Sequence, residues 1–70
     1  MSSSISEKFA SKLKRLRKEK GYSQEEFAFL CHLDRTYIGR IENLKRNPTL
    51  PVLEKIAKRL NMELSELLKF

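Results

Sequence analysis

Cysteine, histidine and tryptophan are scarce in this 70-residue sequence, which has one Cys, one His and no Trp. A lone cysteine cannot form an internal disulfide, and Cys31 with the adjacent His32 offers too few ligands for a zinc site. We therefore expect Cys31 to be a core thiol, His32 to be a turn residue, and the protein to need no metal, cofactor or small-molecule ligand. Because one histidine and scattered acids supply no nucleophile with a base, we do not expect an enzyme.

A long apolar run is also missing. No stretch approaches the roughly 20 apolar residues that cross a bilayer, and the serine-rich start lacks the apolar centre of a signal peptide. We therefore expect a protein that stays in the cytoplasm and makes no membrane contact. The length predicts a single domain over residues 1–70.

Acidic residues are in the minority, with nine Asp or Glu against 15 Lys or Arg and a formal net charge of +6. Residues 1–22 hold seven basic residues and two acids, residues 23–34 hold three acids and no Lys or Arg, and residues 35–49 hold four basic residues and one acid. Two basic segments flanking an acidic one are the footprint of a nucleic-acid binder. Simple solvation of a helix surface by lysine accounts for the charge equally well.

The first expected helix is amphipathic. Its apolar residues are Ile5, Phe9, Leu13 and Leu16, spaced as on one face of a helix. Ser4 with Glu7 has capping-box spacing, and Gly21 suits the left-handed position that follows many helices. We predict a helix over about residues 5–20, preceded by a flexible N-terminus of residues 1–4.

Two short helices joined by a tight turn are predicted within residues 23–43. Ser23 with Glu26 forms a second capping-box pattern, so one helix should run from residue 24 towards residue 31. Asp34 is the candidate N-cap of the other, over residues 35–43. Because only His32 and Leu33 separate the two helices, they must cross at a large angle. Their inward residues are Phe27, Ala28, Cys31, Ile38 and Ile41. This is helix-turn-helix geometry.

The second of these helices has a polar outer face. Its members are Arg35, Thr36, Gly39, Arg40 and Asn43, opposite the inward isoleucines. Arginine suits guanine, threonine suits the thymine methyl group, and asparagine suits adenine or phosphate. The face therefore predicts entry into the major groove of duplex DNA. Single-stranded nucleic acid is disfavoured, because Tyr22 and Tyr37 are the only plausible exposed stacking platforms.

Residues 49–70 predict two more helices. Thr49 can cap a helix that ends near Asn61, and its apolar stripe is Leu50, Leu53, Ile56, Ala57 and Leu60. A last helix over about residues 64–69 carries Leu64, Leu67, Leu68 and the following Phe70. One face of so short a helix cannot bury all four, so we expect a dimer interface within residues 50–70. A hydrophobic lid with a frayed end is the alternative.

Four motifs carry a resemblance to a known family: Ser23-Gln24-Glu25-Glu26 with Ala28, Leu33-Asp34-Arg35-Thr36-Tyr37-Ile38, Ile41-Glu42-Asn43, and Asn47-Pro48-Thr49-Leu50. They resemble the phage-repressor type of helix-turn-helix (the Xre, Cro and lambda-repressor superfamily), and within it the small controller proteins of bacterial restriction-modification systems. The family usually has glycine in the turn, where this chain has His32. Histidine tolerates a left-handed backbone, so we expect an intact turn with strain of about 1 kcal/mol.

The resemblance implies an all-α, five-helix, lambda-repressor-like fold. It implies a homodimer that binds an inverted-repeat operator in duplex DNA and regulates restriction and methylation genes, including its own. A phage-type repressor or an antitoxin is the nearest alternative. A helical protein-interaction module is the rival from another class.

Particular residues are expected at each contact. Base contacts are expected from Arg35, Thr36, Tyr37 and Arg40. Backbone contacts are expected from Gln24, Asn43, Lys45, Arg46 and Asn47, the last three in a loop directly after the groove-entering helix, and, by resemblance, from Arg17. The dimer contact is expected from Leu64, Leu67 and Phe70. By resemblance, Glu25 has the position of the acidic surface with which related repressors contact RNA polymerase. It is equally well explained as an acid that stabilises the N-terminus of its helix.

Overall fold

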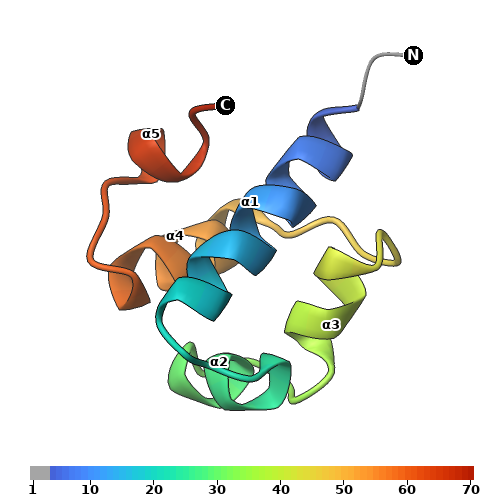
Figure 1. Cartoon of the computed structure of the whole chain (residues 1–70), viewed down its shortest axis with the longest axis vertical. Helices are drawn as coiled ribbons and strands as arrows, with labels where there is room; N and C mark the ends of the chain where they lie inside the picture. Colours follow the sequence, from blue (N-terminus) through green and yellow to red (C-terminus); the bar gives the residue numbers. More distant parts are fainter. Residues whose placement is uncertain (1–3) are drawn as a thin grey trace.

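The computed structural model describes residues 4–70 of the chain. These residues contain five helices and no strand. They are α1 (Ile5–Glu19), α2 (Gln24–Leu30), α3 (Tyr37–Glu42), α4 (Leu50–Arg59) and α5 (Leu64–Leu67). Helix α1 runs through the middle of the molecule, with α2 below it, α3 to one side and α4 to the other (Figure 1). Helix α5 lies at the end of the molecule opposite α2. The expectation of an all-α, five-helix fold is confirmed.

Both predicted capping boxes are present. Glu7 N–H donates to Ser4 Oγ (3.1 Å) and Ser4 N–H donates back to Glu7 Oε1 (2.9 Å). Ser23 and Glu26 repeat this exchange at the start of α2. Each box satisfies backbone N–H groups that a helix start would otherwise leave unpaired. Ser4 is thus fixed at the start of α1, whereas the expected flexibility of residues 1–3 lies outside the described residues.

Four helices end in the same way. A residue with positive φ follows each of them: Gly21, His32, Leu44 and Asn61. Three of these residues were predicted and Leu44 was not. The residue after each one donates its N–H to a carbonyl five residues earlier, which satisfies an otherwise unpaired helix carbonyl. After α1, α2 and α4 this residue is apolar and packs against the core. After α3 it is the exposed Lys45, so the loop that follows turns outward.

The core forms where the helices cross. Its fully buried side chains are Leu13, Phe27, Cys31, Ile38, Ile56 and Leu67, and the five inward residues predicted for the central motif are all buried. Ala28 is also completely buried, and its small side chain lets α2 and α3 pack closely. Across the described residues no helix has the length and apolarity needed to cross a membrane.

Two predicted core residues are exposed instead. Leu50 is 68% exposed because Val52 faces inward, and residues two apart in a helix point about 200° apart. Ile5 is 72% exposed because it lies in the first turn of α1, beyond the body of the core.

Helix α5 corrects the predicted dimer contact. Leu67 has no exposed surface and belongs to the core, so the prediction that it lies at a dimer interface is wrong. A one-turn helix can direct only part of its apolar residues inward, and Leu67 takes that position while Leu64 is partly buried beside it. Leu68 and Phe70 stay exposed. The Lys12 ammonium group donates to the carbonyl oxygens of Glu66 and Lys69 and holds this end of the chain on α1.

Candidate nucleic-acid interface

The start of α3 differs from the prediction. Asp34 Oδ1 accepts the N–H (2.9 Å) and the hydroxyl of Thr36, and Tyr37 N–H donates to the Asp34 carbonyl (3.0 Å). These bonds form a turn, so the helix begins at Tyr37 and not at Arg35. The hydrogen bonds from Thr36 lower the pKa of the Asp34 carboxyl. Arg35 and Thr36 therefore stand on a tight turn at the N-terminal end of α3.

The predicted polar face is on the surface. Arg35, Thr36, Arg40 and Asn43 are exposed, while Ile38 and Ile41 are buried beneath them. Arg35 and Arg40 make no ion pair with any described residue. Their guanidinium donors are therefore free for a ligand outside the chain.

A buried ion pair fixes this face to the other helices. Arg17 Nε donates to Glu42 Oε2 (2.7 Å) and Arg17 Nη2 donates to Glu42 Oε1 (3.0 Å). A third donor, Arg17 Nη1, binds the Tyr22 carbonyl (2.7 Å). The Arg17 and Glu42 side chains are 8% and 2% exposed, and the bond to Glu42 raises the pKa of Arg17. The pair joins α1 to α3 in the bidentate geometry that arginine favours with carboxylates.

This pair contradicts the expected role of Arg17. A guanidinium that is buried and satisfied by a carboxylate and a carbonyl cannot reach a phosphate, so Arg17 is a core residue in the structure. Burial of Arg17 follows from its place on the inner side of α1, one turn after Leu13. That i,i+4 spacing was the available signal in the sequence.

Gln24 joins the same network from α2. Its Nε2 donates to Glu42 Oε1 (3.0 Å), so Glu42 binds residues of α1 and α2 together. The Gln24 side chain is half-buried against α3. It lies at the first position of α2, where a backbone contact was predicted, but its amide group is already engaged inside the protein.

Tyr37 does not belong to the exposed face. It is 9% exposed, and its hydroxyl is buried with no hydrogen-bond partner among residues 4–70. The Arg46 guanidinium lies over its ring, 4.6 Å from the centroid. The expected base contact by Tyr37 is therefore contradicted in this conformation. Tyr37 lies one residue before Ile38 and four before Ile41, which turns it to the inner side of α3.

The loop after α3 brings the other predicted backbone contacts together. Lys45, Arg46 and Asn47 are exposed, and Lys45 N–H donates to the Arg40 carbonyl (2.8 Å), which folds the loop back on α3. Ser6 Oγ donates to Asn47 Oδ1 (3.1 Å) and connects the loop to the start of α1. The loop therefore stands beside the C-terminal end of α3 (Figure 1).

An apolar hollow lies under this loop. Its volume is about 350 Å³, and four of the exposed large hydrophobic residues line it: Ile5, Leu44, Leu68 and Phe70. We call these four residues the apolar face. Only Phe70 was predicted to make an intermolecular contact. Leu68 was named in the same apolar helix, within the segment expected to form the dimer interface. Ile5 and Leu44 were not expected there, because they lie far from Phe70 in the sequence.

Comparisons with known proteins agree with this geometry. The sequence model of the helix-turn-helix family matches residues 13–67. Control protein C.MunI of Mycoplasma sp. is 57% identical over 61 residues, which are 86% of this chain and 82% of the relative. The crystal structure of the restriction-modification controller protein C.AhdI from Aeromonas hydrophila has a TM-score of 0.82 and 45% identity, covering 89% of this chain and 94% of that one.

A third similar protein has been solved with DNA. C.Esp1396I bound to a 25 base pair operator site has a TM-score of 0.80 and 40% identity, covering 96% of this chain and 92% of that one. The same protein has been solved as a tetramer on its natural 35 base-pair operator. The chain described here belongs to the helix-turn-helix family, among the controller proteins of restriction-modification systems.

Proposed function

We propose that this chain is a transcriptional regulator that binds a specific operator in duplex DNA as a homodimer and controls restriction-modification genes, including its own. The observation that carries this proposal is the polar face of α3. Arg40 on α3 and Arg35 on the turn just before it are exposed and unpaired among the described residues, and the inner side of the helix is fixed by the ion pair of Arg17 and Glu42. A rigid helix with free guanidinium donors is suited to reading base edges in the major groove.

The contacts divide into two groups. We propose base contacts from Arg35, Thr36 and Arg40, whose side chains are exposed together. We propose backbone contacts from Asn43, Lys45, Arg46 and Asn47, and from the N-terminal end of α2 near Gln24. Cations and backbone N–H groups beside the groove-entering helix suit phosphate oxygens and carry no sequence preference of their own.

The apolar face is our proposed dimer contact. Four exposed large hydrophobic residues around one hollow form the kind of surface that a second copy covers. In a two-fold dimer the operator half-sites are inverted repeats whose centres are about one helical turn, roughly 34 to 36 Å, apart. C.Esp1396I, which has been solved on operator DNA, supports this assembly by similarity.

We propose that α2 carries the contact through which the protein activates transcription. Glu26 is engaged in its capping box, whereas Glu25 is exposed and makes no ion pair with another described residue. We therefore propose Glu25 as the acidic contact to RNA polymerase. The protein would act at bacterial DNA in the cytoplasm, by binding and not by catalysis, as its DNA-binding relatives suggest.

Footprinting over the chain's own promoter tests the function directly. We expect one protected inverted repeat, with affinity for it at least about 10³-fold above that for random duplex of equal length at the same salt concentration. Equal affinity for both duplexes would contradict sequence-specific regulation. Protection only at promoters unrelated to restriction or methylation genes would favour a phage-type repressor or an antitoxin.

A further inference from the structure

A second positively charged surface lies away from α3. A hollow of about 390 Å³ is lined by Leu30, Cys31, His32, Lys55, Lys58 and Arg59, and we call it the cationic cup. It is formed by the C-terminal end of α2 and the outer side of α4. In Figure 1 the C-terminal end of α4 lies on the left of the molecule and α3 on the right. The C-terminal end of α4, which helps to form the cup, therefore lies on the side of the molecule away from α3.

The cations of the cup form no ion pair with a described residue. Lys55, Lys58 and Arg59 contribute three positive charges, and no carboxylate among residues 4–70 lies within 4.0 Å of them. Lys55 and Lys58 also line the neighbouring hollow together with Glu54 and Glu63, but they form no ion pair with these glutamates.

The floor of the cup adds no negative charge. Cys31 is 1% exposed, and burial raises its pKa to about 11, against the opposing effect of the Arg59 and Lys55 charges. The thiol is therefore protonated at neutral pH.

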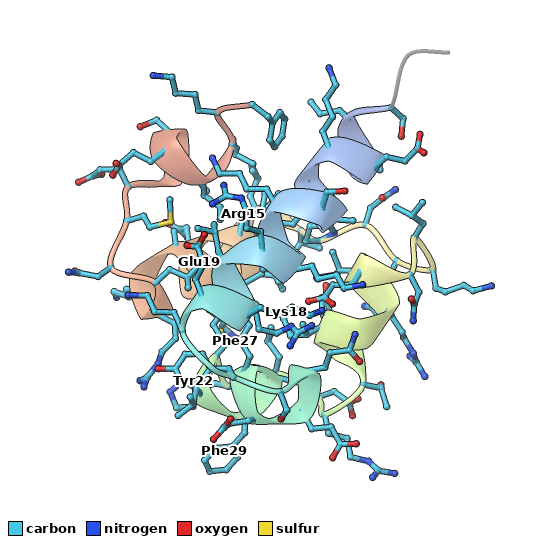
Figure 2. The ribbon with its side chains drawn as sticks, in the orientation of Figure 1. Arg15, Lys18, Glu19, Tyr22, Phe27 and Phe29 are labelled. Atoms are coloured by element: carbon cyan, nitrogen blue, oxygen red, sulfur yellow. The ribbon has the colours of Figure 1, made fainter. Side chains whose placement is uncertain are left out.

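Arg59 contacts Tyr22, which stacks on a core residue. Its Nη2 donates to the Tyr22 hydroxyl (3.4 Å), and its guanidinium lies 5.9 Å from the Tyr22 ring centroid. Tyr22 stacks in turn on the buried Phe27, with centroids 5.7 Å apart and planes 17° apart. Both rings are labelled in Figure 2, beside the lower end of α1. These contacts favour one orientation of the guanidinium before a ligand binds, which lowers the entropic cost of binding.

We propose that the cationic cup binds a free oligophosphate, such as inorganic triphosphate or the triphosphate group of a nucleotide. Ammonium and guanidinium groups are donors without acceptors, and phosphate oxygens are acceptors that match them in charge and number. Cations at a helix C-terminus also stabilise the helix by themselves. That effect accounts for Lys58 and Arg59 but not for Lys55, which lies a turn earlier, nor for the support from Tyr22.

Titration with inorganic triphosphate, followed by calorimetry and by backbone amide shifts, tests the site. We expect saturable binding at one site, with the largest shifts in residues 30–32 and 55–59. The double variant Lys55→Gln/Lys58→Gln should weaken binding about tenfold or more. Lys14→Gln/Lys18→Gln removes the same charge from exposed positions of α1 and should change the affinity by less than about twofold. Equal losses in both variants, or no saturable binding, would overturn the proposal.

A second arm separates the cup from the DNA-binding face. Triphosphate should bind with the same affinity when the protein is saturated with duplex DNA from its own promoter. Displacement of triphosphate by the duplex would mean that the phosphates occupy the DNA-binding face and would overturn the proposal. Tyr22→Phe removes only the hydroxyl that supports Arg59, so weaker triphosphate binding with unchanged thermal stability is expected of a positioning residue.

Discussion

Gln24 lies directly against the backbone of Gly39. A Cβ atom added to Gly39 would be 2.9 Å from Gln24 Oε1, closer than ordinary van der Waals contact allows. Gly39 is in the regular part of α3 and does not have positive φ. A side chain at this position would therefore compete for space with the end of the flexible Gln24 side chain, whereas the backbone conformation would accept it. The contact couples α2 to α3 beside the hydrogen bond from Gln24 to Glu42.

Gly39→Ala should therefore have opposing effects on stability. Alanine gains about 1 kcal/mol of helix propensity over glycine, whereas displacement of Gln24 loses a hydrogen bond to a carboxylate, worth about 1.5 kcal/mol. We expect the free energy of unfolding in urea to change by less than about 1 kcal/mol. In a Gln24→Ala background the same change should stabilise the protein by about 1 kcal/mol. An identical effect in both backgrounds would show that the contact has no energetic consequence.

Because Arg17 and Glu42 form a buried ion pair, the stability of the fold should depend strongly on both residues. Arg17→Ala leaves the buried Glu42 carboxylate uncompensated and should reduce the free energy of unfolding by about 3 to 5 kcal/mol. The double variant Arg17→Met/Glu42→Leu should retain most of the stability, because it removes both charges. Chemical denaturation measures each variant.

The salt dependence of DNA binding tests whether Arg17 only forms the buried ion pair or also contacts a phosphate, as the resemblance suggested. In the folded double variant Arg17→Met/Glu42→Leu, the slope of log K against log salt on random duplex should equal that of the wild type. A slope smaller by about 0.9 would mean that Arg17 had contacted a phosphate.

The sequence predicted best what is determined locally. The capping boxes at Ser4 and Ser23 act over three residues, and the left-handed positions at Gly21, His32 and Asn61 are favoured by single residue types. These signals located the helices to within one or two residues. They also located the turn between α2 and α3, and with it the exposed face of α3.

Errors arose where a side chain has to choose between neighbours distant in sequence. Arg17 is one of several basic residues on α1, and only packing of α3 against α1 brings Glu42, 25 residues later, to it. Leu67 and Leu68 are adjacent in sequence, yet one is fully buried and the other exposed, since one residue rotates a helix position by about 100°. Such choices depend on tertiary contacts that periodicity alone does not specify.

Mutations should distinguish the residues that contact bases from those that contact the DNA backbone. Arg35→Ala or Arg40→Ala should cost about 1 to 3 kcal/mol on the operator and relax the preference at one base pair, because a bidentate contact to guanine would be lost. Lys45→Ala should weaken binding to operator and random duplex alike and reduce the salt slope by about 0.9. Fluorescence anisotropy on both duplexes measures these effects. Equal losses on both duplexes for the arginine variants would exclude a base contact.

Reversal of charge at Glu25 should separate activation from DNA binding. Glu25→Lys should abolish activation in a promoter-reporter assay while operator binding is retained, because the proposed contact is to polymerase. Glu54→Lys is the matched control, since it reverses an exposed acid on α4 and should leave activation unchanged. If the Glu25→Lys variant still activates transcription, Glu25 does not contact polymerase and only stabilises the N-terminus of α2.

The neighbouring residues Leu67 and Leu68 provide a paired test of the dimer. Leu68→Asp introduces a charge into the apolar face, so it should convert dimer to monomer in sedimentation at roughly tens of micromolar protein while helicity is retained. Operator affinity should fall far more than random-duplex affinity, because two half-sites can no longer be bound together. Leu67→Asp should instead unfold the chain, since its side chain has no exposed surface, and Leu67→Ala should cost about 2 to 5 kcal/mol. If Leu68→Asp remains dimeric, the second copy does not bind at the apolar face. A folded monomer from Leu67→Asp would instead place Leu67 in the dimer contact.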